Sequence, residues 1–529
     1  MRSTFAGFTT AQLALRASQQ GLNVTGQNIS NINTSGYTRQ ALDQISLNFT
    51  NGGRYGTSTN IGHGVMVKNI TQIRDPFLDI RFRTEIAQVG EADVKLSSLK
   101  ELESIFDEVA KDGLQNQISD LASMLQKLST NVGSKEFENM VKSSSESLTK
   151  LFNQYAKQLE AVRKDQDYNL KEVDIPEIND ILKNIAELNK TIKNSQINGN
   201  PSLELLDKRN MLIDELASYV KIDVKYVPVK LSDSLTVNEL RIDFVGANNN
   251  INLIKGDEHV SFEVPDGTTQ LNIVDKDGNQ ITNDAGIAIG EDIFSELTTG
   301  SLKSSLEMLN CSGEFDDKAN SPKGIGYYEK MLDLMASKFA DVFNDLNNAG
   351  LPAGTPPDDL HNLFGSTDGG PITAKNISIA SGWSTDKYGI TASVPAPPPA
   401  DPPASGANDN ILNMIDALNK DHDFIHTGAD PADPADDVNM FKGSFHQFFS
   451  KVSSTLGIEI KSTSKLLDNH IAVANEIANA KDSISGVSLD EEGMNLLKFQ
   501  KSYTAAARLM TTLDEALDTI INKMGVVGR

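Results

Sequence analysis

Apolar residues recur every seven positions in the C-terminal segment LDEEGMNLLKFQKSYTAAARLMTTLDEALDTIINKMG, residues 489–525. A second apolar line lies three residues beyond the later members of the first, and no proline interrupts either line. Heptad lines of this length are typical of a helix that packs along another helix. The first line contains Leu489, Leu496, Tyr503, Met510 and Leu517, and the second contains Phe499, Ala506, Leu513 and Ile520.

The N-terminal segment carries a narrower heptad line. This line contains Phe8, Leu15, Leu22 and Ile29, and the next positions in the seam are mostly small. The segment NISNINTSGY, residues 28–37, then ends the helix, because Asn, Ser and Gly readily adopt turn conformations. We therefore expect residues 1–45 and 488–529 to form paired terminal helices, a coiled coil. Periodicity alone favours pairing within one chain, and it leaves open pairing with neighbouring copies.

Composition limits the function classes. The chain has 529 residues, a formal net charge of −24, 39% hydrophobic residues and one cysteine. That length predicts about three to five domains. The acidic excess argues against nucleic-acid binding, which needs a basic surface, and a single cysteine excludes an intrachain disulfide framework. No apolar run is long enough to cross a membrane, and the first residues lack the continuous apolar region of a secretory signal.

Charge is distributed unevenly along the chain. The first 42 residues contain three arginines, Arg2, Arg16 and Arg39, and no acidic residue. A segment of an acidic chain that excludes acids is expected either to pack against a crowded or acidic neighbour or to be handled by other machinery before it folds.

The middle of the chain alternates between helical and strand periodicity. Residues 77–220 show apolar steps of three and four, with breaks predicted at Pro176 and Pro201, and long helices with single seams favour an elongated bundle. Residues 221–299 alternate with period two between Gly/Asn/Asp clusters, which predicts a β-rich outer domain. We assign residues 46–220, 300–350 and 440–487 to a helical rod domain.

Prolines are concentrated in residues 351–439, in strings such as PAPPPADPP and DPADPADD. Such a composition does not favour a packed core, so we expect a surface insertion of exposed loops, with short ordered pieces at ITAKNISIA and NILNMIDALN. The predicted fold is therefore mainly α with a β-rich central domain. It is an elongated multi-domain chain that begins and ends in the same base.

No catalytic or metal-binding pattern emerges. His422 and His426 have helical spacing, but no Glu follows the first of them as a zinc protease would require. The string starting at Asp275 resembles a calcium loop, but its twelfth position is Gly286 where a bidentate Glu is needed. We therefore expect no enzyme activity, no cofactor and no metal site.

The string NISNINTSGYTRQ, residues 28–40, resembles the motif shared by bacterial flagellar rod, hook and hook-associated proteins. Its GYTRQ ending is similar to that of the first hook–filament junction proteins, the hook-associated protein one or FlgK type. Three further segments resemble that type: one contains LLDKRN at residues 205–210, one is SELTTGSLKSSLEML at residues 295–309, and one covers the C-terminal heptads. Cys311 and the 351–439 insertion depart from the family pattern.

The resemblance implies a structural protein that joins the distal end of the hook to the filament. It implies terminal helices that line a hollow tube, are largely unfolded in the free monomer and fold on assembly. It also implies export through the flagellar type III apparatus without a cleaved signal peptide, and an extracellular location in the flagellum. The implied partners are further copies of the chain, the hook protein, the second junction protein and an export chaperone, with no nucleic acid and no membrane.

Two sets of residues are the candidate site. The assembly seam consists of Phe8, Leu15, Leu22, Ile29, Leu489, Leu496, Phe499, Tyr503, Met510, Leu513, Leu517 and Ile520, and the turn motif consists of Asn28, Asn31, Thr34, Gly36, Tyr37 and Arg39. The alternatives are a hook protein or flagellin of the same axial family, against which the GYTRQ and LLDKRN strings count. A third alternative, from another class, is a secreted effector that carries a flagellar-type export leader.

Overall fold

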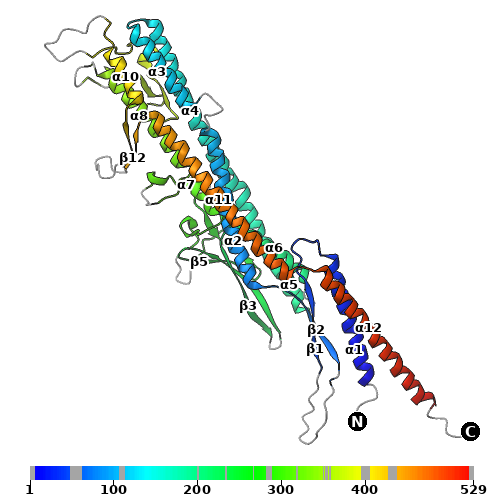
Figure 1. Cartoon of the computed structure of the whole chain (residues 1–529). Coiled ribbons are helices and arrows are strands. Elements are labelled where there is room, and N and C mark those ends of the chain that lie inside the picture. Colours follow the sequence, from blue (N-terminus) through cyan, green and yellow to red (C-terminus); the bar gives the residue numbers. More distant parts are fainter. Residues whose placement is uncertain are drawn as a thin grey trace, which may run out of the picture.

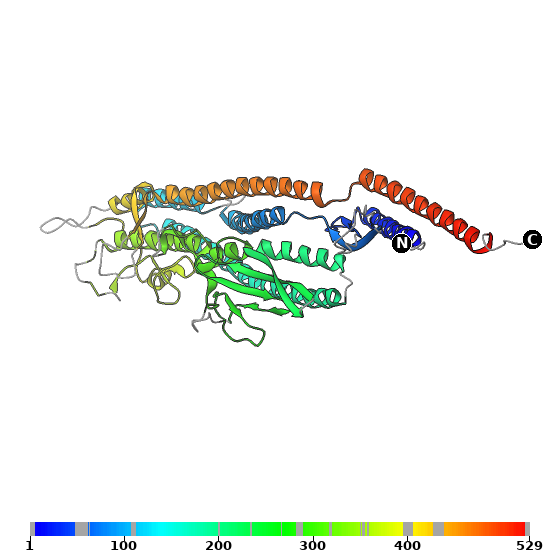
Figure 2. The same cartoon turned by 90° about the horizontal axis from the view of Figure 1, so that it is seen from below.

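The computed structural model describes residues 6–47, 62, 64–106, 113–198, 202–232, 235–265, 267–281, 289–316, 320–349, 351, 355–356, 359–394, 406–426 and 438–523. They form an elongated molecule (Figure 1). The first and last long helices lie side by side at one end, and α3 (Leu114–Thr130) and α10 (Asp409–Asn419) lie at the opposite end. The second view shows the last two helices following one another along the long axis (Figure 2).

The terminal helices are α1 (Ala6–Ser30) and α12 (Leu489–Asp518), which pack against each other. A π-helical turn, η6 (Thr519–Lys523), extends α12. The side chain of Ser488 caps the start of α12 by accepting a hydrogen bond from the Glu491 amide, and three acids in the first turn complement the positive end of the helix dipole.

Residues 40–72 contain a β-hairpin that the sequence analysis did not predict. Strand β1 (Gln40–Ser46) pairs antiparallel with β2 (Val65–Gln72), and both contact α1. The assignment of a helical domain from residue 46 onward is therefore wrong for the described residues before α2. Neither strand has a strict alternation of buried and exposed residues, so the period-two pattern was too weak to identify them.

Long helices form the rod. They are α2 (Pro76–Phe106), α3 (Leu114–Thr130), α4 (Lys135–Asn169), α5 (Ile175–Ile197), α6 (Leu203–Tyr219), α7 (Ser301–Asn310), α8 (Ile325–Asn348) and α11 (Phe445–Ser485). The pairs α2–α11, α3–α4 and α5–α6 are in contact, and the apolar seams predicted from steps of three and four are buried between them.

Pro176 does not end a helix as expected. The chain passes from α4 into α5 through a π-helical turn, η1 (Leu170–Asp174), and Pro176 occupies the first turn of α5. The missing proline N–H is tolerated there, and the wider turn absorbs the ring without a break.

The β-rich part lies beside the rod near its middle (Figure 1). A four-stranded antiparallel sheet has the order β3 (Ile222–Ser232), β4 (Leu235–Val245), β5 (Asn250–Lys255) and β6 (Glu258–His259). Strands β7 (Ser261–Glu263) and β8 (Asn272–Val274) form a second pair. Helix α5 contacts β4, β5, β6 and β7, and a short 3-10 helix, η2 (Ile293–Glu296), leads back toward α7.

The segment between α8 and α11 contributes to the largest core. It contains β9 (Phe364–Ser366), β10 (Ile377–Ile379), α9 (Ser381–Ser384), α10 (Asp409–Asn419), β11 (His422–His426) and β12 (Val438–Gly443). Trp383, Met414 and Phe424 are buried against the side chains of α4, α8 and α11. The expectation that this segment lacks a packed core is wrong for these pieces, while the strings PAPPPADPP and DPADPADD lie outside the described residues.

The predicted fold class is confirmed: the chain is mainly α, elongated and multi-domain, with small sheets. Among the described residues, no helix combines the length and apolar character needed to cross a membrane.

Candidate functional site: the terminal helices and their joint to the rod

Helices α1 and α12 pack closely because α1 presents glycines to large side chains of α12. A methyl group at Gly21 would lie 2.5 Å from Phe499 Cδ1, and one at Gly7 would lie 3.1 Å from Leu513 Cδ1. Since the position on α12 falls as the position on α1 rises, the helices are antiparallel. The buried residues of α1 include the small side chains Ala11, Ala17 and Ser18, which allow the two backbones to approach.

The structure divides the predicted seam of α12 into covered and uncovered parts. Phe499 and Leu513 lie against α1 and are half-buried, as are Met510 and Leu517, and Ala506 is buried. In contrast, Leu489, Leu496, Tyr503 and Ile520 are 59%, 39%, 41% and 48% exposed. On α1, the predicted residues Phe8, Leu15, Leu22 and Ile29 are all half-buried.

The apolar arc of α12 is wider than one helix can cover. With 3.6 residues per turn, Leu496 and Tyr503 lie on one side of the line through Phe499 and Leu513, and Leu509 lies on the other. Leu509 is also exposed, at 46%. We call Leu489, Leu496, Tyr503, Leu509 and Ile520 the outer stripe; within the chain itself these residues remain between 39% and 59% exposed.

Asn28 holds the end of α1 to the start of β1. Its amide group donates from Nδ2 to the Gln40 carbonyl (2.9 Å) and accepts at Oδ1 from the Gln40 amide (3.0 Å), and the side chain is almost fully buried. The Tyr37 hydroxyl donates to the same Oδ1 at 2.9 Å. The Asn28 side chain thus makes the two hydrogen bonds to Gln40 that the backbone of a neighbouring strand would otherwise make. An apolar side chain cannot make them.

The turn between them is fixed by local bonds. Thr34 Oγ1 donates to Asn31 Oδ1 (3.2 Å), and the Thr34 amide donates to the Asn31 carbonyl (2.9 Å). Gly36 has φ +75°, and a methyl group there would collide with Met211 of α6. The left-handed conformation favours glycine at this position, whereas the exposed and flexible Met211 side chain can move away from a methyl group.

Arg39 connects the motif to α11 and α12. Its Nε donates to Glu492 Oε1 at 2.8 Å, its Nη1 pairs with Glu491, and its backbone amide donates to the Ser485 carbonyl at 2.8 Å. The Glu492 side chain is 2% exposed, so this carboxylate depends on Arg39 for its charge partner.

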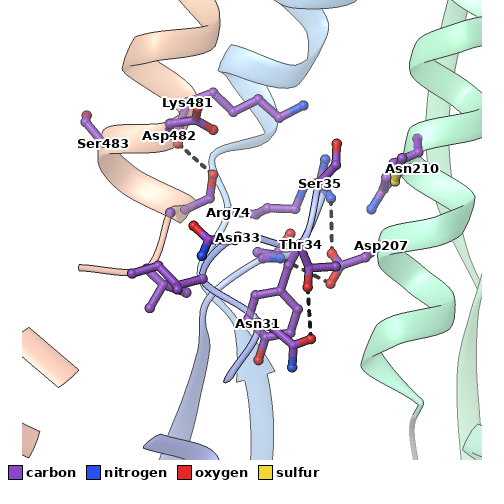
Figure 3. A pocket seen from close by; sticks show the side chains of 18 of the residues that line it. Asn31, Asn33, Thr34, Ser35, Arg74, Asp207, Asn210, Lys481, Asp482 and Ser483 are labelled. Carbon is purple, nitrogen blue, oxygen red and sulfur yellow. Dashed lines mark hydrogen bonds and ion pairs between the residues drawn. The ribbon is translucent and has the colours of Figure 1, made fainter. Parts of the chain in front are cut away.

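Asp207 of α6 fixes the motif to the rod from the other side (Figure 3). Its Oδ2 accepts from the Thr38 amide (3.1 Å), and its Oδ1 accepts from Gln72 Nε2 (2.8 Å) at the end of β2. Burial raises the pKa of Asp207 in spite of these bonds. Burial, together with the negative charges of Asp207, Glu204 and Glu492, raises the pKa of Tyr37 to about 12.

On the rod side of the motif, a network of charged side chains holds the rod helices together. Arg74 donates to both Asp79 oxygens, at 2.9 and 3.0 Å. Lys481 of α11 contacts Asp79 (3.1 Å) and Asp214 of α6 (2.9 Å), and Arg83 of α2 donates to Asp214 (2.7 Å). Burial acts against the Asp79 charge, but Arg74, Lys481 and Arg83 outweigh it and lower its pKa.

A polar cavity of about 640 Å³ lies between the motif and this network (Figure 3). Its walls include the motif residues 31–38, Arg74 and Asp214, and the chain segment that leads from α11 to α12. The motif therefore connects to the rod around a cavity, through a few directed bonds.

The structure brings all six predicted motif residues into one joint, although Asn31 and Thr34 act only within the turn. Sequence reasoning missed Asp207, Glu492 and Ser485 as their partners. The LLDKRN element contains Asp207, so its resemblance to the family was a usable indication. Glu492 gave none, because it lies in an ordinary acidic first turn. Among the described residues, no group of three or more His, Cys, Asp or Glu side chains could hold a metal ion.

Comparison with known proteins agrees with this geometry. The family model for the flagellar hook-associated protein FlgK helical domain matches residues 99–360, the flagella basal body rod protein model matches residues 8–38, and the flagellar basal body rod FlgEFG protein C-terminal model matches residues 482–523. The two short models thus cover the two helices that pair at the base.

Whole-chain relatives have the same description. The chain is 28% identical over 549 residues to flagellar hook-associated protein 1 of Bacillus subtilis, covering 100% of both chains. It is 24% identical to flagellar hook-associated protein 1 of Escherichia coli, covering 97% of this chain and 98% of the relative. The solved structure of the flagellar hook junction protein FlgK from Burkholderia pseudomallei has a similar fold, with a TM-score of 0.54 and 12% identity, over 77% of this chain and 100% of that one.

Proposed function

Because the chain belongs to the FlgK-type family of flagellar hook-associated proteins, we propose that it joins the distal end of the hook to the filament as a self-assembling structural segment of the bacterial flagellum. The observation that carries this proposal is the outer stripe of α12, which leaves apolar side chains uncovered at the end of the molecule where the terminal helices meet.

The stripe favours helix-to-helix assembly with further copies of the chain. Fully burying one Leu or Ile side chain stabilises a contact by about 1.5–3 kcal/mol, so several along one helix supply a substantial driving force. A single chain obtains only the contact between α1 and α12. Neighbouring copies in a ring or tube would cover Leu496 and Tyr503 on one side and Leu509 on the other.

The joint supports an adaptor role. The terminal helices would form the inner part of the tube, and the motif would set the direction in which the rod and the β-rich part project outward. The partners in this proposal are other copies, the hook protein, the second junction protein and an export chaperone. The location is the extracellular flagellum, reached by flagellar export. The role is structural and not enzymatic.

The experiment introduces a charge into the seam. Leu496→Asp, and separately Leu517→Asp, should leave a folded rod that does not assemble, because the new carboxylate would be buried without a partner, between copies at Leu496 and on the α1-facing line at Leu517. Thr504→Asp is the matched control, since Thr504 is exposed on the face of α12 opposite Phe499 and Leu513.

The readouts are circular dichroism of the purified chain and electron microscopy of cells that express each variant in place of the original protein. We expect native helicity for all three variants, and filament-bearing hooks only with Thr504→Asp. Normal filaments with Leu496→Asp and Leu517→Asp would refute the proposal.

A further inference from the structure

The heptad lines of the terminal helices do not by themselves define how far one helix is shifted along the other. Both lines repeat every seven residues, so sliding α12 by seven positions along α1 still places apolar residues opposite apolar residues. A polymer built from these helices needs one register, because a slip would displace the whole outer stripe relative to the joint. Some feature other than the heptads must therefore select it.

We propose that Gly7 and Gly21 are register-determining residues, which accept Leu513 and Phe499 and thereby exclude the slipped pairings of α1 with α12. Fourteen residues separate Gly7 from Gly21, and fourteen separate Phe499 from Leu513, so both contacts belong to one antiparallel register. Each large side chain fits where the opposite helix has no Cβ atom.

The slipped registers lack this fit. A shift of seven residues places Phe499 opposite either Ala14 or Asn28. The Phe499 ring already lies 2.5 Å from the ideal Cβ position of Gly21, so the same approach at any other residue type meets a Cβ atom. The heptad contacts alone make the native and slipped registers similarly stable, and the steric clash destabilises only the slipped ones.

An independent set of contacts fixes the same register. Continuing from the two glycines, Asn28 comes level with Glu492. Glu492 accepts from Arg39 Nε, and the neighbouring Gln40 is bonded to Asn28 through both of its backbone groups. The ion pair at the joint and the glycine contacts along the helices therefore agree, and a slip would break both.

Glycine at Gly21 is not explained by its backbone conformation, which is helical. Gly26 offers a matched comparison in the same helix, because a methyl group there would have no atom within 4 Å. Alanine favours a helix over glycine at both positions. Only the contact with α12 distinguishes the two substitutions.

The test is cysteine cross-linking of the full chain, in which Ala14→Cys and Ala506→Cys report the native register. We expect Gly21→Ala to lower the yield of this disulfide at least tenfold and Gly26→Ala to leave it unchanged. Adding Phe499→Leu to Gly21→Ala should restore most of the yield, because the smaller side chain makes room for the methyl group.

A second pair, Ser18→Cys with Asn495→Cys, reports a slip of seven residues, and all variants carry Cys311→Ser. Each is measured on the purified chain and on flagella sheared from cells. Equal yields for Gly21→Ala and Gly26→Ala would overturn the proposal, and so would a native pair that cross-links in neither sample of the otherwise unmodified chain.

This inference rests on the proposed function only where it says that the register serves assembly. A chain that cross-links in the native register but bears no filaments would contradict the junction role and leave the register assignment intact. Filaments that form normally with Gly21→Ala, while the slipped pair cross-links, would show that assembly does not need this register, and would overturn the register's proposed role in assembly.

Discussion

At the scale of single residues, the joint depends on side chains that take the place of backbone groups as hydrogen-bond partners. Asn28 bonds both backbone groups of Gln40, and Asp207 accepts the amide of Thr38. Sequence reasoning located the turn correctly, because Asn, Ser and Gly identify themselves locally. It did not pair the turn with Asp207, because the two partners are 169 positions apart and only the family resemblance of LLDKRN pointed to that residue.

Asn28→Ala should loosen the joint. The substitution leaves the Gln40 carbonyl and amide without their buried partner and removes the acceptor of the Tyr37 hydroxyl, which we expect to destabilise this region by about 1–3 kcal/mol. The measurement is amide hydrogen exchange of β1 in the full chain, which should accelerate. Asn33→Ala, at an exposed position of the same turn, is the control, and equal exchange rates in both variants would contradict the assignment.

At the scale of elements, periodicity predicts the long helices and the alternating strands well. The expectations from sequence fail at the β1–β2 hairpin, at Pro176 and in the proline-rich region. The β1–β2 hairpin has no clean alternation because it packs on α1 and leaves much of its surface exposed. The average composition of the proline-rich region predicts exposed loops. It hides the short apolar pieces around Phe364, Trp383 and Phe424 that enter the core. The heptads predicted the contact between α1 and α12, and they did not show which members of the predicted seam α1 would cover.

The π-helical turn between α4 and α5 gives an element-scale prediction. Burial, reinforced by the Glu177 charge, raises the pKa of Asp174 to about 6. An unfolded Asp ionises near pH 3.9, so the folded state binds more protons between about pH 4 and pH 6. The Asp174 contribution to stability is therefore favourable below pH 4 and is lost as the pH rises to 6.

Asp174→Asn should consequently stabilise the rod at pH 7, by about 1 kcal/mol once solvent screening is allowed for, and flatten the pH dependence between 4 and 6. Urea unfolding followed by circular dichroism at pH 4, 5 and 7 measures both effects. Asp165→Asn, at an exposed position of α4, should change neither. An Asp174→Asn variant that is no more stable at pH 7 than the original chain would rule the argument out.

At the scale of the whole molecule, the chain runs out along the rod and returns, so that residues from its two ends meet at one joint. The largest core lies in the outer rod, where α4, α8 and α11 meet, and a second core lies under the β-rich part. Among the described residues, no comparable buried cluster includes α12, whose buried residues are Glu492 and Ala506. The terminal helices are thus the part of the described chain with the least internal support, which suits an element that completes its packing on assembly.

Amide hydrogen exchange by mass spectrometry, on the purified monomer and on flagella sheared from cells, tests the central claim that neighbouring copies cover the outer stripe. The account predicts that α12 exchanges much faster than α11 in the monomer and becomes strongly protected in the flagellum. If α12 is equally protected in both samples, its stripe gains no partner on assembly, and the claim is contradicted.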